Sequence, residues 1–115
     1  MSTIGSVLRR LLYIFAILLL IEQLALVAWA AGTVRIVQKD RAFQPTQITI
    51  AAGDTLQFTN EDTFLHQIYV NSPKMTFESN EQPPGQTIEL GFPTAGTFEV
   101  HCHIHPKMLL TVTVR

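Results

Sequence analysis

Several features are scarce in this chain, and each scarcity excludes a class of protein. The 115 residues contain a single cysteine, Cys102, so no disulfide can form within the chain and a disulfide-stapled scaffold is excluded. Eight basic side chains stand against nine acidic ones, which gives a formal net charge of −1. Without a run of basic residues, nucleic acid is excluded as the partner. The length leaves room for one folded domain only, because each of two would be too short to bury a core.

The apolar residues are concentrated near the start of the chain. Two arginines precede an unbroken apolar run over residues 11–21, and a second apolar stretch ends in Ala28-Trp29-Ala30. A basic start, a short apolar run and small residues at alternate positions predict a secretory signal, residues 1–30, that is cleaved after Ala30. The alternative is a retained membrane anchor. In that case Glu22 costs on the order of 3 kcal/mol, and the stretch approaches the roughly 20 residues of a spanning helix.

Residues 31–115 are expected to form the folded domain, in the periplasm or another space outside the cytoplasm. No segment of this part keeps a helical apolar period over two turns, and apolar and polar residues alternate instead. Turn-forming segments separate the alternating runs: Asn60-Glu61-Asp62, Asn71-Ser72-Pro73, Pro83-Pro84-Gly85 and Pro93-Thr94-Ala95-Gly96. About seven short strands with such punctuation predict an antiparallel β-sandwich or barrel.

The alternation also predicts where two reactive side chains point. Side chains at positions i and i+2 lie on the same face of a strand. Cys102 is in phase with the apolar residues two and four positions before it, and His66 with those two and four positions after it. We therefore expect Cys102 and His66 on the inward face, at the ends of two strands. His101 is out of phase with Cys102 and is expected to point to solvent.

The last turn brings further metal-binding side chains within reach of Cys102. Residues 102–108 read Cys-His-Ile-His-Pro-Lys-Met, so that cysteine, histidine and methionine recur at intervals of three and can converge on one point. A second imidazole, that of His66, comes from a distant strand. Two histidines, a thiolate and a thioether form a soft, mixed donor set, which suits copper better than zinc.

Each of these residues has an ordinary structural explanation when it is taken alone. A lone cysteine often simply packs, Met108 would serve as core filler, and His66 would be a hydrogen-bonded core histidine. His103 and His105 would be surface residues. Taken together these explanations are improbable, because an unpaired thiol in an oxidising compartment is a liability unless something binds it. The donor set and the strand phase together favour one metal site.

Other segments extend the pattern over nearly all of residues 33–115. They are Phe43-Gln44-Pro45, Gly53-Asp54-Thr55-Leu56-Gln57-Phe58, Asn60-Glu61-Asp62, Phe77-Glu78-Ser79 and Gly96-Thr97-Phe98. With these segments and the loop, the chain resembles the cupredoxins, the small blue copper proteins, and among them the amicyanin, plastocyanin and pseudoazurin group. The short Cys-x-x-His-Pro-x-Met loop looks most like that of amicyanin.

The resemblance implies an all-β, Greek-key β-sandwich that follows the apolar N-terminal segment and holds one type 1 copper at one end. It implies that the copper ligands are His66, Cys102, His105 and Met108. It also implies that His105 is the ligand nearest the surface, beside a docking patch that includes Lys107. The expected function is one-electron transfer between larger redox proteins, with a quinoprotein dehydrogenase as donor and a cytochrome c as acceptor.

An enzyme is not expected, because the sequence offers neither an open coordination position nor an acid–base pair. The carboxylates are assigned to turns and outward strand faces. We expect a monomer that contacts a membrane only if residues 1–30 are retained. The alternatives are a copper storage or delivery protein of the cell envelope, in which His101 and His103 assist transfer, and a β-sandwich interaction module with a vestigial site.

The chain departs from the family pattern at two positions close to Cys102. Ile104 stands where the family usually has proline, so it has a backbone N–H that those relatives lack. If this N–H donated to the sulfur of Cys102, it would stabilise Cu(I) and raise the reduction potential. Gln67 stands where relatives often have asparagine, and its backbone N–H is expected to donate to the same sulfur.

Overall fold

The computed structural model describes residues 2–25 and 30–115 of the chain. The chain divides into two units, Met1–Ala30 and Ala31–Arg115. The first unit contains one helix, α1 (Ser2–Ala25). In the described part of the chain, no helix combines the length and the hydropathy needed to cross a membrane. Ala28 and Trp29 of the predicted cleavage motif lie outside the described residues.

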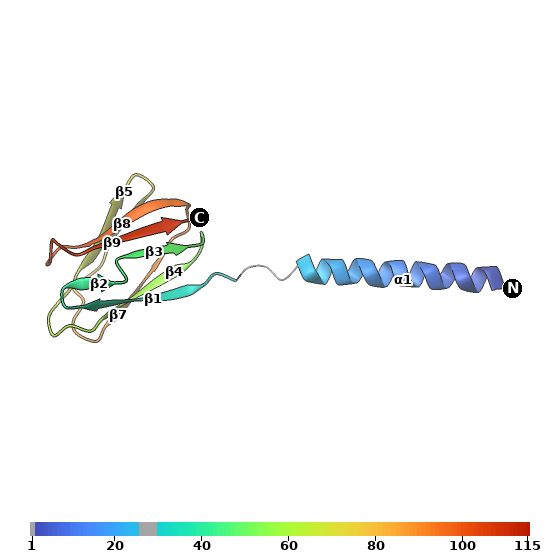
Figure 1. The fold of residues 1–115 in the computed structure, drawn as a ribbon, viewed down its shortest axis with the longest axis horizontal. Helices are drawn as coiled ribbons and strands as arrows, with labels where there is room; N and C mark the ends of the chain where they lie inside the picture. Colours follow the sequence, from blue (N-terminus) through green and yellow to red (C-terminus); the bar gives the residue numbers. More distant parts are fainter. Residues whose placement is uncertain (1, 26–29) are drawn as a thin grey trace. The chain divides into compact units, whose positions relative to one another are not determined.

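Residues 31–115 form two β-sheets (Figure 1). The strands are β1 (Thr33–Lys39), β2 (Ala42–Gln44), β3 (Gln47–Ile50), β4 (Thr55–Asn60), β5 (Ile68–Ser72), β6 (Met75–Glu78), β7 (Thr87–Gly91), β8 (Gly96–Cys102) and β9 (Leu109–Val114). One sheet has the order β2-β1-β4-β7, and the other has the order β3-β9-β8-β5-β6. The predicted all-β architecture is therefore confirmed, with nine strands in the described residues where about seven were expected.

The prediction of antiparallel strands is correct for five of the seven strand pairs in the described residues and wrong for the other two. Strands β1 and β4 pair in parallel, and so do β3 and β9. The chain leaves the first sheet after β2, enters the second as β3 and returns as β4 beside β1. Alternating hydrophobicity specifies which face of a strand is buried, but it does not specify the direction of the neighbouring strand.

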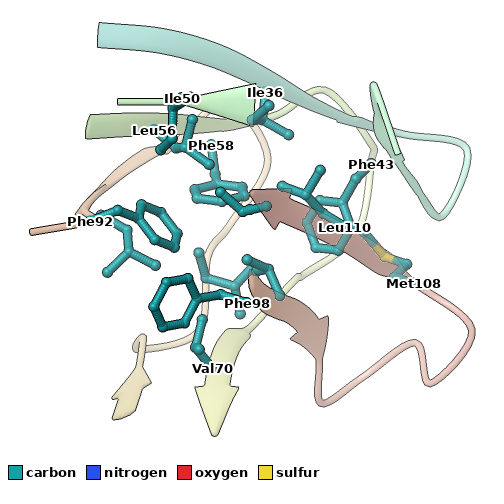
Figure 2. Packing of buried hydrophobic residues seen from close by; sticks show 14 of the residues in the cluster. Ile36, Phe43, Ile50, Leu56, Phe58, Val70, Phe92, Phe98, Met108 and Leu110 are labelled. Carbon is teal, nitrogen blue, oxygen red and sulfur yellow. The ribbon is translucent and has the colours of Figure 1, made fainter. Parts of the chain in front are cut away.

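The core lies between the two sheets and follows the predicted alternation. In β4 every second residue is buried, including Leu56 and Phe58. Phe58 packs edge-on against Phe43, with ring centroids 5.9 Å apart. Figure 2 shows these rings among the apolar side chains of both sheets, with Met108 at one end of the cluster. Full burial of each large apolar side chain contributes about 1.5–3 kcal/mol to stability.

This framework brings the predicted site residues to one end of the second sheet. Ile68 of β5 pairs with Cys102 of β8, and His66 lies two residues before Ile68. The backbone of His66 forms a bridge with Gln82, through hydrogen bonds of 3.1 and 2.7 Å. Because β8 and β9 are antiparallel neighbours, the loop over residues 103–108 returns directly beside the strand that it leaves. Strand β8 also confirms the predicted burial of Cys102.

Candidate metal centre

Three metal-binding side chains converge at this end of the sheet. The ligand atoms of His66, Cys102 and His105 all lie within 4.8 Å of one another. The sulfur of Cys102 lies 3.7 Å from Nδ1 of His66 and 3.8 Å from Nδ1 of His105. Two bonds of about 2.0–2.3 Å that diverge from one ion produce separations of this size. In the described part of the chain, this is the one group of three or more histidine, cysteine or acidic side chains that meets in this way.

Met108, the fourth predicted ligand, belongs to the same loop. Its side chain is 1% exposed and is part of the hydrophobic core. Its backbone N–H donates to the carbonyl oxygen of His105 over 3.0 Å, which closes a tight turn between the two residues. The structure therefore places Met108 next to His105 in the loop, while coordination by its thioether stays a prediction.

The three converging residues differ in exposure. His66 is 0% exposed and Cys102 is 2% exposed, whereas His105 is half-buried. The ring of Phe64 packs against both imidazoles, 5.5 Å from that of His66 and 5.0 Å from that of His105, and the guanidinium of Arg41 lies 4.9 Å above the Phe64 ring. Desolvation lowers the pKa of His105, and its electrostatic interactions with His66 and with the cation of Arg41 lower it further, against an opposing effect of Asp62. Both effects favour the neutral imidazole that a metal ion requires.

The hydrogen bonds to the cysteine sulfur agree with one expectation and not with another. The backbone N–H of Gln67 donates to Sγ of Cys102 over 3.5 Å, as predicted. The other polar contacts of this sulfur in the described residues are the two histidine nitrogens, and the N–H of Ile104 is not among its donors. The condition under which Ile104 would raise the reduction potential, an N–H donated to this sulfur, is therefore not met. The strand pairing of β5 with β8 carries Gln67 to the sulfur, and the loop holds Ile104 elsewhere.

A carboxylate that the sequence analysis assigned to a surface turn lies behind the site. Asp62 is 6% exposed, and its Oδ2 lies 2.8 Å from Nε2 of His66. Its oxygens also accept hydrogen bonds from the backbone N–H groups of Asp40 (2.7 Å) and Arg41 (3.3 Å). Burial alone raises the pKa of Asp62, but the hydrogen bonds from His66 and the two N–H groups outweigh it, so the pKa lies below its usual value. The spacing of four residues between Asp62 and His66 was the available signal.

The two remaining histidines lie outside the converging group. His101 is half-buried rather than free in solvent, because its ring stacks on Tyr69 at 5.3 Å. His103 stacks on the same tyrosine at 3.9 Å. Each imidazole also pairs with a carboxylate at 3.2 Å, His101 with Glu99 and His103 with Glu78. These contacts hold both rings on the outer face of the sheet.

The residues at the site fit a copper ion by their chemistry. Two imidazole nitrogens and one buried thiol converge, and a buried thioether follows in the same loop. Nitrogen and sulfur donors of this kind select copper among the common biological metals when a thioether is included. A role as a metal ligand would account for the burial of this unpaired cysteine beside two histidines.

Comparisons with known proteins point to one family. The cupredoxin-like domain family matches residues 10–114. Plastocyanin from Ulva prolifera is 32% identical over 85 residues, which cover 64% of this chain and 87% of the relative. The Cu(I) form of an amicyanin mutant has the same fold, with a TM-score of 0.68 at 22% identity over 76% of this chain and 87% of amicyanin.

A third similarity is to part of a larger protein. A Cu-containing nitrite reductase from Thermus scotoductus superposes with a TM-score of 0.65 at 25% identity, over 72% of this chain but only 22% of the reductase. The family match, by contrast, extends over most of the chain and includes all four predicted ligands. The chain therefore belongs to the cupredoxin-like family, whose domains bind one copper ion.

Proposed function

We propose that this protein is a type 1 blue copper electron carrier, in which His66, Cys102, His105 and Met108 hold the copper. The observation that carries the proposal is the convergence of the Cys102 sulfur with two imidazole Nδ1 atoms at 3.7 and 3.8 Å. When bound, the copper supplies a one-electron couple between Cu(II) and Cu(I). The proposed ligand set leaves no open position for a substrate, so we propose a carrier rather than an enzyme.

The protein keeps the ligands in place and keeps water away from most of them. Burial of His66 and Cys102 against the core excludes solvent, and the pairing of β5 with β8 fixes both residues in the backbone. Ligands that are fixed in advance need not rearrange when the charge of the site changes, which favours rapid exchange. His105 is half-buried whereas the other proposed ligands are buried, so we propose it as the route of the electron to the surface.

A docking patch for redox proteins is proposed around His105. The large apolar side chains that residues 30–115 expose are Leu65, Ile104 and Leu109, at 38–42%, and each is the chain neighbour of a proposed ligand. A hollow of about 420 Å³ beside His105 is lined by Ile104 and Pro106, by the cations of Arg41 and Lys107, and by Asp40. Transient redox interfaces are small, below about 1,200 Å² in total. The loop resemblance supports a quinoprotein dehydrogenase donor and a cytochrome c acceptor, with the carrier as a monomer.

The proposed location is the periplasm or another space outside the cytoplasm. The basic and apolar start of the chain supports export, and residues 1–30 would then be the signal and residues 31–115 the working domain. The mass of the protein recovered after export tests this proposal. A mass that begins at Ala31 would support cleavage after Ala30, whereas the full-length mass would support retention of the segment.

The absorption spectrum of the copper-loaded protein tests the proposed function. An intense visible band from charge transfer between thiolate and Cu(II) is expected, and Cys102→Ser should abolish it. His103→Ala is the matched control, because this histidine lies next to Cys102 but outside the converging group, and it should keep the band. A labile, colourless Cu(I) site would contradict electron transfer and would indicate copper storage or delivery.

A further inference from the structure

The two nitrogens of the His66 imidazole face different partners. Nδ1 lies 3.7 Å from the Cys102 sulfur, whereas Nε2 lies 2.8 Å from a carboxylate oxygen of Asp62. An ionised carboxylate can only accept hydrogen bonds, so Nε2 must carry the proton in this contact. In the neutral ring Nδ1 then keeps its lone pair and points it at the metal side.

The carboxylate of Asp62 is itself held by a strand turn that is distant in sequence. Asp40 and Arg41 form the two-residue loop between β1 and β2, and both have a φ of 55°. Positive φ at both positions is the geometry of a type I′ turn, which residues other than glycine adopt only at a cost in conformational energy. The conformation directs two consecutive N–H groups at Asp62, at 2.7 and 3.3 Å.

The backbone of Asp62 is also held, by the segment that leads to His66. The backbone N–H of Asp62 donates to the side chain of Asn60 over 2.9 Å. The amide of Asn60 in turn donates to the carbonyl oxygens of Phe64 and Gln82, both at 2.9 Å. Asp62 is therefore fixed from both sides, by the hairpin turn and by the segment that leads to His66.

We propose that Asp62, braced by the Asp40–Arg41 turn, is a positioning residue of the copper centre that fixes the orientation and protonation of His66 and lowers the reduction potential. The inference rests on the proposed function. A carboxylate that accepts from a ligand imidazole raises its basicity and thereby strengthens binding of the more highly charged ion. Cu(II) gains more from this effect than Cu(I), so the oxidised state is favoured.

The test compares Asp62→Asn with Asp54→Asn in the full chain. Asp54 is a matched control because it also accepts two backbone N–H groups, from Gly32 at 2.7 Å and Ala51 at 2.9 Å, but touches no proposed ligand. Asp62→Asn should weaken Cu(II) binding about 10- to 100-fold. Because Cu(I) binding should change less, the exchange equilibrium with a reference redox couple should move about tenfold toward Cu(I), or about 59 mV. Asp54→Asn should leave both quantities unchanged.

A second measurement does not need the copper or the variant. Nitrogen NMR of the metal-free wild-type protein should show His66 protonated at Nε2, with slow exchange of that proton. Protonation at Nδ1 instead would overturn the proposal, as would equal potentials for Asp62→Asn and Asp54→Asn. A wild-type protein without a blue copper spectrum would refute the proposed function alone, because the protonation of His66 is still read from the metal-free protein.

Discussion

At the scale of single residues, the cysteine sulfur shows how backbone pairing decides which groups tune the site. Gln67 is held next to Cys102 by the pairing of β5 with β8, and its N–H lies 3.5 Å from the sulfur. Ile104 is closer in sequence to Cys102, yet its N–H has no bond to the sulfur. Hydrogen bonds to a thiolate withdraw electron density from it and stabilise the reduced metal.

The first prediction separates these two residues. Ile104→Pro removes an N–H that does not contact the sulfur, so the reduction potential should stay unchanged. Gln67→Pro removes the N–H that does, and it should lower the potential. Voltammetry of the two copper-loaded variants measures both effects. A fall in potential for Ile104→Pro alone would show that the loop donates to the sulfur after all.

The same residues show how much of the site the sequence could predict. Strand phase predicted the burial of His66 and Cys102, and the spacing within the loop predicted the approach of His105. Asp62 lies only four residues before His66, but both stand between β4 and β5, where strand phase gives no direction, so Asp62 was not predicted as part of the site. Its other partners, in the β1–β2 turn, lie 21 and 22 residues away. The alternation of apolar and polar residues within one strand contains no information on contacts between distant segments. Gln38 is a different case: its position in phase with Ile36 places it on the inward face, and only the polarity of its side chain argued against the full burial that the structure shows.

At the scale of elements, one turn ties the starts of β1 and β4 to the end of β3. The carboxylate of Asp54, between β3 and β4, accepts hydrogen bonds from Gly32, just before β1, and from Ala51, just after β3. Both hydrogen bonds lower the pKa of Asp54, and the one from Gly32 has the larger effect. This turn lies at the opposite end of β4 from Asn60 and the site, so it contributes to the sheet and not to the metal centre.

The second prediction follows from the lowered pKa of Asp54. A carboxyl group with a lowered pKa in the folded state stabilises the fold above its unfolded pKa of 3.8, and this stabilisation is lost as the pH falls through the folded value. Asp54→Asn should therefore lower the unfolding free energy at neutral pH but make little difference near about pH 2. Urea unfolding of the metal-free protein at both pH values measures this. If Asp54→Asn lowered the unfolding free energy equally at both pH values, the charge of Asp54 would not be the cause of the loss.

At the scale of the whole molecule, charge is distributed unevenly around the proposed electron port. The chain carries a formal net charge of −1, yet two cations, Arg41 and Lys107, and one acid, Asp40, line the hollow beside His105. Charges around a contact site change the rate of encounter with charged partners much more than charges elsewhere. Reversal of the charge at Lys107 should therefore change the rate of encounter with charged redox partners.

The third prediction uses the anion hexacyanoferrate(III) as the oxidant of the reduced protein. Lys107→Glu should slow the reaction about tenfold at low ionic strength, and the difference should shrink as salt shortens the Debye length below about 10 Å. Lys74→Glu is the control with the same change of charge, because Lys74 lies beside Ala95 near the start of β8, whereas the site lies at the end of that strand. Stopped-flow mixing over a range of salt gives both rates. If the oxidation rates of the two variants depended on salt concentration to the same degree, the encounter site would lie elsewhere on the surface.

Burial of the Cys102 side chain has a consequence for the protein before it receives its metal. At 2% exposure, the side chain of Cys102 is shielded from the surfaces of other proteins. A disulfide between two folded molecules would therefore need local opening around Cys102, even in an oxidising compartment that favours such bonds. Folding thus slows disulfide formation by the metal-free protein, and binding of a metal ion would then complete the protection of the sulfur.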